Sequence, residues 1–241
     1  MRLEEKMISV ICCFNRYDAF CTMRESLYTQ NIKTEVIGVD NSKGRFPSAA
    51  AALNWGAEQA NGDILVFLHQ DIVFLREDSL ARLVGGVQQV SGDAVVGIFG
   101  AGEAEQNTKI GDFSLCDTLD ECCIAMRRTT WQRLKFNEDI CDGWHLYVVE
   151  FCLRARSIKA VVCSNNCDIQ HLSNGTVNEE YMKTFKKLLI EYKDQKWIRT
   201  TCKSMPTNLP VYYGYYFAWK LKKILVGNYP LLFSIRQRIK K

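Results

Sequence analysis

The chain has 241 residues and is 47% hydrophobic, so it can bury a full core as one large domain or as one domain with an appendage. Its eleven cysteines, an odd number in a chain of this size with no signal peptide, exclude the disulfide framework of a small secreted protein and predict free thiols in a reducing cytoplasm. The net charge is +4, but nine Lys or Arg and no Asp or Glu lie in residues 197–241, so the preceding residues carry −5. A basic partner surface is therefore expected only at the C-terminus.

Strands and helices alternate through the first third of the chain. Residues 7–14 are an apolar run that predicts a strand, and residues 17–30 predict a helix. Residues 34–39 predict a second strand of β-branched residues, followed by an Ala-rich helix over residues 48–60. Residues 64–68 are a short, continuous apolar run, which is typical of a strand covered on both faces. This alternation predicts a doubly wound, mainly parallel sheet.

A polar cluster follows each of these strands: Asn15-Arg16, Asp40-Asn41 and His69-Gln70-Asp71. Because ligands bind at the carboxyl ends of strands in open α/β sheets, the clusters are expected to line one crevice. Asp71 is the first candidate for a functional residue, since a carboxylate on a rigid strand can hold Mg²⁺ or Mn²⁺ against a diphosphate. The alternatives are that Asp71 only ends its strand or caps the next helix, and that Asp40 is an Asx-turn residue. Neither GxGxxG nor GxxxxGK(S/T) occurs, so no dinucleotide-binding Rossmann unit or P-loop is predicted.

The order of these segments, with Asn54 in the Ala-rich helix ahead of ANGDILVFLHQD, resembles the nucleotide-sugar half of the family 2 glycosyltransferases with the GT-A fold. The likeness covers about residues 7–175, and its HQD sequence resembles the small branch related to the streptomycin-biosynthesis type. It implies that Asp71 binds Mg²⁺ or Mn²⁺ and that Asp40 reads the nucleoside of a nucleotide-diphosphate sugar. His69 replaces the first Asp of the family's DxD motif, which removes the carboxylate that usually contacts the ribose. The donor site is expected to include Phe14, Asn15, Arg16, Asp40, Asn41, Asn54, His69 and Gln70.

The middle of the chain is less regular. Residues 82–90 predict the end of a helix, residues 94–99 a fourth strand and residues 122–126 a further strand. A loop over residues 97–120 is predicted to act as a substrate lid or an acceptor contact. Trp131 is predicted either to stack on a sugar or to lie in the core.

Asp142 is predicted to cap a helix over residues 144–157. In the family, the start of this helix presents the general base, but the corresponding position here is Val148, which cannot accept a proton. Asp142, His145 and Glu150 are the candidate replacements. Asp142 is preferred because a helix N-terminus faces the crevice, whereas Glu150 lies two turns in and can form a surface ion pair. The alternative is a catalytically impaired homologue that binds a nucleotide-sugar or a glycan.

His171 follows a last short strand predicted over residues 161–163, in a segment where members of the family commonly carry a metal-ligand histidine. Imidazole is a reasonable ligand beside Asp71 and the oxygens of a diphosphate. The chain has only three histidines, and all of them lie in segments assigned to the crevice. This coincidence favours a functional role for His171 over a structural one.

Residues 177–241 are predicted to form a helical, basic and aromatic extension of a GT-A domain that spans residues 1–176. Residues 179–197 predict an amphipathic helix. Residues 211–223 combine six aromatic side chains with three lysines and no acid, which is typical of a segment at an anionic membrane surface. No run reaches the roughly 20 apolar residues needed to span a bilayer. The alternative is that the aromatic side chains pack on the catalytic domain or on a second subunit.

Together with the resemblance, these patterns predict a cytoplasmic, membrane-peripheral glycosyltransferase that depends on Mg²⁺ or Mn²⁺. It is expected to move a sugar, with inversion, from a nucleotide donor to a glycan or lipid-linked glycan in the synthesis of cell-surface polysaccharide or a related glycan. A homo-oligomer is compatible with the aromatic tail. Nucleic acid is not an expected partner, because the rest of the chain is acidic and no nucleic-acid-binding motif occurs.

Overall fold

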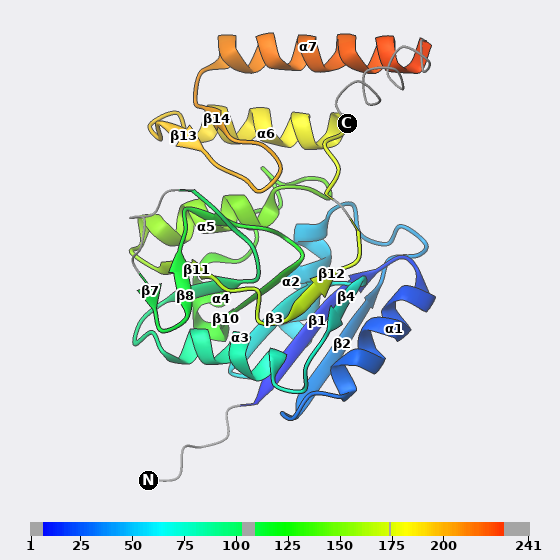
Figure 1. The fold of residues 1–241 in the computed structure, drawn as a ribbon, viewed down its shortest axis with the longest axis vertical. Helices are drawn as coiled ribbons and strands as arrows, with labels where there is room; N and C mark the ends of the chain where they lie inside the picture. The colour runs from blue at the N-terminus through cyan, green and yellow to red at the C-terminus, as the bar shows by residue number, and fades with distance from the viewer. Residues whose placement is uncertain (1–6, 103–108, 174, 229–241) are drawn as a thin grey trace, which may run out of the picture. The chain divides into compact units, whose positions relative to one another are not determined.

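The computed structural model describes residues 7–102, 109–173 and 175–228 (Figure 1). The chain divides into two compact units. The first comprises Met1–Phe185 and Arg199–Ser204, and the second comprises Lys186–Ile198 and Met205–Lys241. All site residues predicted from the sequence lie in the first unit. The domain boundary after residue 176 stays a prediction.

The first unit is built on an eight-stranded sheet. β1 (Ile8–Phe14) lies parallel between β2 (Thr34–Asp40) and β3 (Ile64–His69), as the apolar runs predict. β10 (Cys123–Arg127) is antiparallel to its neighbours β3 and β5 (Ala94–Gly97), while β11 (Val161–Ser164) is parallel to β5. The strand order is β2-β1-β3-β10-β5-β11-β8-β7, in which β8 is Phe113–Leu115 and β7 is Lys109–Ile110. The predicted α/β class is confirmed, and β10 makes the sheet a mixed one.

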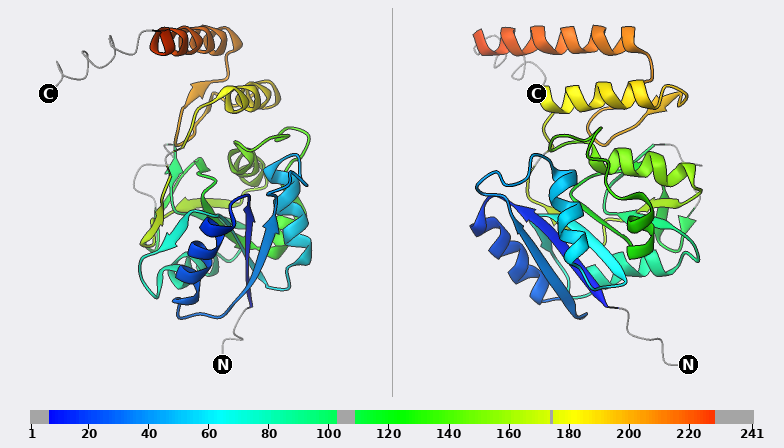
Figure 2. Two further views of the ribbon diagram at one scale, coloured as in Figure 1. Left: turned by 90° about the vertical axis from the view of Figure 1, so that its right-hand side faces the viewer. Right: turned by 180° about the vertical axis from the view of Figure 1, so that it is seen from behind.

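Helices cover both faces of this sheet, and Figure 2 shows α1 and α2 on opposite sides of it. α1 (Tyr17–Tyr28) and α3 (Ser79–Gln88) bury their apolar side chains in the cluster on one face. α2 (Ala49–Gln59), α4 (Arg128–Leu134) and α5 (Tyr147–Ser157) contribute to the cluster on the other face. β3 lies between the two layers and is buried from Ile64 to Leu68, which confirms the prediction of a strand covered on both sides.

Small side chains let α2 lie close to the sheet. Ser48 begins the helix by accepting a hydrogen bond from the Ala51 N–H at 3.2 Å, which satisfies one free donor of the first turn. A Cβ added at Gly56 would lie 2.6 Å from Ile11 Cγ2, so only glycine fits where α2 crosses β1. The small-residue pattern of this helix therefore follows from its packing on the sheet.

The segment after β5 contains strands where the sequence predicts a loop. β6 (Gly100–Ala101) pairs with β9 (Thr118–Leu119), and β8 joins the central sheet beside β11. Phe113 of β8 is buried against Gly86, where an added Cβ would lie 2.7 Å from the ring. The prediction of a continuous loop is therefore wrong for these residues, because ladder hydrogen bonds and a buried aromatic ring fix them. Residues 103–108 of the predicted lid lie outside the described residues.

The second unit contains the end of α6 (Glu179–Glu191), a short pair of strands and α7 (Leu209–Asn228). β13 (Trp197–Ile198) pairs antiparallel with β14 (Met205–Pro206), so the helix predicted over residues 179–197 ends earlier than expected. Along α7, the rings of Tyr212 and Tyr216 stack with centroids 5.9 Å apart, and Tyr216 stacks on Trp219 at the same distance. None of the helices in residues 7–102, 109–173 and 175–228 is long and apolar enough to cross a bilayer.

Candidate active site

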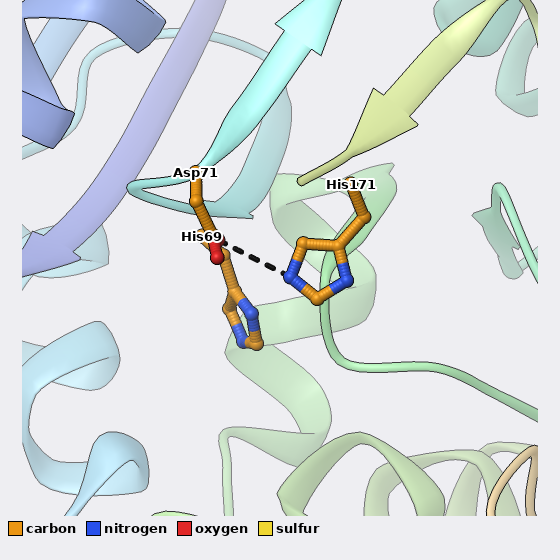
Figure 3. A group of neighbouring side chains, drawn as sticks. All are labelled: His69, Asp71 and His171. Carbon is orange, nitrogen blue, oxygen red and sulfur yellow. Dashed lines mark ion pairs between the residues drawn. The ribbon is translucent and has the colours of Figure 1, made fainter. Parts of the chain in front are cut away.

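Two short strands beside the central sheet bring Asp71 and His171 together. β4 (Ile72–Phe74) begins directly after Asp71, and β12 (Ile169–His171) pairs antiparallel with it. The Leu172 N–H donates to the Asp71 carbonyl at 3.0 Å. As a result, His171 Nε2 lies 3.2 Å from Asp71 Oδ1 (Figure 3). The backbone ladder therefore holds the two side chains next to each other.

The surroundings of Asp71 keep its carboxyl ionised. Burial alone would raise the pKa of this group, but hydrogen bonds from His171 and Ser173 hold the pKa well below its usual range. The surroundings of His69 instead disfavour its charged form. Burial, reinforced by the nearby His171, lowers the pKa of its imidazole to about 4. His69 is therefore neutral at pH 7, and its Nε2 lies 3.1 Å from the Tyr147 hydroxyl.

The side chains of this group converge closely enough to share a cation. The ligand atoms of His69, Asp71 and His171 all lie within 4.8 Å of one another. One carboxylate and two imidazoles are a donor set that suits divalent ions such as Mn²⁺. A second group of ligand atoms, from Asp120, Cys122 and His171, meets the same distance limit. The residues present therefore fit a divalent metal.

Gln70 ties the loop after β1 to the turn after β3. Its Oε1 accepts hydrogen bonds from the N–H groups of Asn15 and Arg16 at 3.2 and 2.9 Å, and its Nε2 donates to Asn15 Oδ1 at 2.8 Å. A cavity of about 290 Å³ lies at this junction, and its lining includes Arg16, Gln70, Asp71 and Ser173. Two of the three polar clusters predicted to line one crevice are thus joined directly.

The third polar cluster lies at the same edge of the sheet. Asp40 ends β2 opposite Phe14, the last residue of β1, and is exposed. Its Oδ1 accepts a hydrogen bond from the Ser42 N–H at 2.8 Å, so the Asx turn forms, and the hydrogen bonds from Ser42 lower the pKa of the Asp40 carboxyl. Asn41 is buried, and its amide bonds the backbone N–H and carbonyl of Phe46 at 2.7 and 3.2 Å. Asp40 therefore stands exposed at the edge, whereas Asn41 shapes the loop.

Comparison with known proteins identifies the fold that carries these residues. Residues 44–161 match the family model described as Glycosyl transferase family 2. The structure resembles mannosyltransferase PcManGT from Pyrobaculum calidifontis in complex with GDP-Man and Mn²⁺, with 14% identity and a TM-score of 0.54 over 88% of this chain and 69% of that one. It also resembles S. aureus TarS 1-349 in complex with UDP-GlcNAc, with 16% identity and a TM-score of 0.51 over 77% of this chain and 66% of that one. The chain has the GT-A glycosyltransferase fold.

A third solved structure similar to this GT-A chain is the catalytic domain of Drosophila beta1,4galactosyltransferase 7 in complex with xylobiose. It is 15% identical, with a TM-score of 0.52 over 76% of this chain and 80% of that one. The GT-A chain spans slightly less than two thirds of TarS 1-349, at 66%. No curated protein sequence matches it. These likenesses establish the fold, and the activity has to be argued from the site.

In this GT-A domain, Asn54 belongs to the scaffold of the site. Its Nδ2 donates to Phe136 O and Glu138 Oε1, and its Oδ1 accepts from Trp131 Nε1 and the Phe136 N–H, at distances from 2.8 to 3.2 Å. These bonds use the full hydrogen-bonding capacity of the amide, which leaves none for the predicted donor contact. Trp131 is buried, so the core role predicted for it as one alternative is confirmed.

Two of the three candidate bases in the GT-A domain are held by basic side chains. Glu150 is fully buried in α5, where Nε and Nη2 of Arg154 donate to its two oxygens at 2.8 Å each. Asp142 is paired with Lys183 at 3.2 Å. Neither carboxylate belongs to the group of ligand atoms around His171.

α5 begins later than the sequence predicts. Its first residue is Tyr147, which follows Leu146 in a left-handed conformation with φ of 66°, and no side chain caps the helix. The prediction that Asp142 caps this helix is therefore wrong. The turn ahead of α5 is fixed by another helix instead, because Glu180 Oε1 of α6 accepts a hydrogen bond from the Trp144 N–H at 2.5 Å.

The charge state of His145 suits the role of a base. Burial lowers the pKa of its imidazole from the ordinary value, although the nearby Glu180 acts in the opposite direction. His145 is also close enough to His69 that a positive charge on it disfavours a charge on His69. His145 is therefore neutral near pH 7 and able to accept a proton.

Sequence reasoning missed four residues of the GT-A site. Asp120 and Cys122 offer ligand atoms close to His171, and Tyr147 contacts His69. The Glu121 carboxyl is buried at the start of α5, and burial raises its pKa well above the usual range, with Asp120 adding to the effect. One feature of the sequence could have pointed to this segment: the acidic pair Asp120-Glu121, which directly precedes the strand predicted over residues 122–126.

Proposed function

We propose that the chain is an inverting family 2 glycosyltransferase that uses a divalent cation to move a sugar from a nucleotide-diphosphate sugar to a glycan or lipid-linked glycan. The observation that carries this proposal is the convergence of His69, Asp71 and His171 at the carboxyl edge of β3, with Asp71 lining a cavity of about 290 Å³. The match of residues 44–161 to the glycosyl transferase family 2 model supports it. The nucleotide-sugars in the TarS and PcManGT complexes, and the Mn²⁺ in the latter, agree with it.

The donor site follows from the charges at this edge. The diphosphate is placed beside Arg16 and Asp71, which both line the cavity, because a guanidinium suits phosphate oxygens. Asp40 contacts the nucleoside from the exposed end of β2. Asp71, His69 and His171 hold the Mg²⁺ or Mn²⁺ ion. When bound, this cation supplies Lewis-acid neutralisation of the charge on the departing diphosphate.

The proton of the acceptor hydroxyl goes to His145. An inverting transfer needs a base within hydrogen-bond reach of this hydroxyl, and the resemblance places Val148 at the usual position. Asp142 and Glu150 are each held by a basic side chain. His145 is neutral near pH 7 and close enough to His69 to affect its pKa, so it is the candidate that its charge state favours.

Donor hydrolysis tests whether this site turns over. In the presence of Mn²⁺ and without acceptor, UDP-, GDP- and dTDP-sugars are tried in turn, and one of them is expected to release its nucleoside diphosphate slowly. Chelation of the metal should stop this release.

The alternative function, which Val148 favours, is a homologue that binds a nucleotide-sugar or a glycan without turnover. Donor binding with no nucleotide release, either alone or after sugar acceptors are added, would favour this alternative. Binding of no donor would contradict the donor site itself.

We also propose that α7 holds a cytoplasmic enzyme at the inner face of a membrane. Lysine side chains of α7 lie over aromatic rings one turn away, Lys220 over Tyr216 and Lys223 over Trp219. Exposed apolar side chains beside lysines suit an anionic membrane surface. The alternative is that this helix packs on a second copy of the chain. The exposed apolar residues recur at helical spacing along one stripe of α7, as Tyr213, Phe217, Leu221 and Ile224.

Replacing Lys220, Lys222 and Lys223 together by glutamine is expected to weaken binding to anionic vesicles by about 10²-fold. Each lysine near such a surface contributes about 1 kcal/mol. Binding should also weaken as the Debye length falls from about 10 Å at 0.1 M salt to about 3 Å at 1 M. Co-sedimentation with vesicles measures this loss, with truncation after Leu209 as the reference for full release and donor binding as the control for the fold. Equal vesicle binding by the wild type, the triple variant and the truncated chain would contradict the membrane role.

A further inference from the structure

A second set of metal-ligand atoms shares His171 with the proposed donor site. The carboxylate of Asp120, the thiol of Cys122 and the imidazole of His171 all lie within 4.8 Å of one another. Asp120 and Cys122 belong to the segment that leads into β10, whereas His171 ends β12. Three different ligand types from two distant segments therefore meet at one point.

Hydrogen bonds fix the segment that carries the acid and the thiol. Asp120 Oδ1 accepts a hydrogen bond from the Cys122 N–H at 3.1 Å, and Oδ2 accepts one from Thr201 Oγ1 at 2.5 Å. The Cys122 carbonyl accepts a hydrogen bond from the His69 N–H at 2.9 Å, which ties the segment to the end of β3. Because these groups are ordered before any ion arrives, binding a cation here costs little further ordering.

The chemistry of this set differs from that of an oxygen-lined magnesium site. Thiolate and imidazole ligands select zinc-class cations, whereas Mg²⁺ prefers oxygen ligands. The Cys122 thiol would release its proton when it binds the ion. Three protein ligands also leave the fourth tetrahedral position open to water or to another ligand. We propose that Asp120, Cys122 and His171 form a binding site for a zinc-class divalent cation.

An ion in this site competes with the donor-site metal for His171. His171 Nε2 lies 3.2 Å from Asp71 Oδ1, and Figure 3 shows the second nitrogen of its ring facing away from Asp71. A neutral imidazole has only one nitrogen lone pair to offer, so an ion held by Asp120 and Cys122 would take the ligand that the Asp71 group needs. This consequence rests on the proposed function. Competition for His171 would make the zinc-class ion an antagonist of Mn²⁺-dependent donor binding.

Co²⁺ alone, added to the full-length protein, tests the site directly. A cobalt–thiolate bond gives a charge-transfer absorption band that oxygen and nitrogen ligands do not give. The band is expected in the wild type and should be lost in Cys122→Ser, with Co²⁺ affinity falling by more than about 10-fold, since even changes outside the ligand shell cost about 10- to 100-fold. Cys123→Ser is the matched control at the neighbouring buried thiol and should keep the band, as should Asp71→Asn.

A band that persists in Cys122→Ser, or no band in the folded wild type, would overturn the proposal. Circular dichroism shows whether each variant is folded. Asp120→Asn is the second variant, in which Co²⁺ affinity should fall while the cobalt–thiolate band remains at saturation.

The cobalt experiment is independent of donor binding, because the band is measured without nucleotide. If the protein shows a Cys122-dependent band but binds no donor, the proposed function is contradicted and the cation site is not. Where donor binds, Zn²⁺ should weaken Mn²⁺-dependent binding more in the wild type than in Cys122→Ser, and equal weakening would contradict the competition.

Discussion

Replacing His145 with glutamine is expected to lower turnover by about 10²- to 10⁴-fold while donor binding stays intact, because general-base help contributes about this factor. Glutamine keeps a side chain of similar length and polarity but cannot accept the proton. His145 is the candidate base because burial keeps it neutral and because it lies near His69. The measurement is kcat for sugar transfer or donor hydrolysis, together with the Kd of the donor.

The pH dependence of kcat gives this prediction a second readout. Burial lowers the pKa of His145 in the folded protein, so the neutral base persists to a lower pH than in an ordinary histidine and is lost as the pH falls through the lowered pKa. We therefore expect kcat to be flat near neutral pH and to fall only when the pH drops below the ordinary pKa of a histidine. His69 stays neutral in this window, because burial lowers the pKa of its imidazole to about 4. The fall in kcat should be missing in His145→Gln.

The two carboxylate candidates are the matched controls. Asp142→Asn should keep most of its turnover. Glu150→Gln should lower the free energy of unfolding by about 1.5 to 3 kcal/mol, because it disrupts charged hydrogen bonds to Arg154 in the interior, with little direct effect on kcat. Full turnover in His145→Gln combined with a loss of about 10²-fold in Asp142→Asn would return the base to Asp142, the residue that the sequence favours.

Local sequence rules predict the part of the site that parallel strands build. The apolar runs that become β1, β2 and β3 are readable from the sequence, and parallel pairing then brings their polar ends to one edge. Gln70 and Asp71 belong to this edge because they follow β3 directly. His171 reaches Asp71 through the pairing of β12 with β4, which the sequence pattern does not show, and only its resemblance to a metal-ligand histidine marks it.

Long-range contacts decide the rest, and no local pattern contains them. β10 lies between β3 and β5, so Asp120 and Cys122 reach His171 only because of that strand order. The turn ahead of α5 is held by Glu180 of another helix, so a capping pattern read from the nearby sequence misplaces the helix start. The amide of Asn54 makes its hydrogen bonds to the segment around Phe136, and the position of Asn54 in α2 does not reveal this contact.

Replacing Asp71 with alanine is expected to weaken metal-dependent nucleotide binding by more than about 10²-fold, since even residues outside a ligand shell contribute about 10- to 100-fold. Asp71 is the ionised carboxylate of the group, and its hydrogen-bonded surroundings keep it charged. Alanine removes that charge and one of the three converging ligand atoms. The matched control is Asp63→Ala. It removes an exposed carboxylate that directly precedes the first residue of β3, at the end of the strand away from Asp71, and should bind donor as the wild type does.

Calorimetric titration with UDP, GDP and dTDP, with and without Mn²⁺, is the most direct test of the metal-dependent donor site. We expect one of these nucleotides to bind the wild type and Asp63→Ala only when Mn²⁺ is present, and to lose this binding in Asp71→Ala. Metal-independent binding at full strength in Asp71→Ala would contradict the assignment of the site to Asp71.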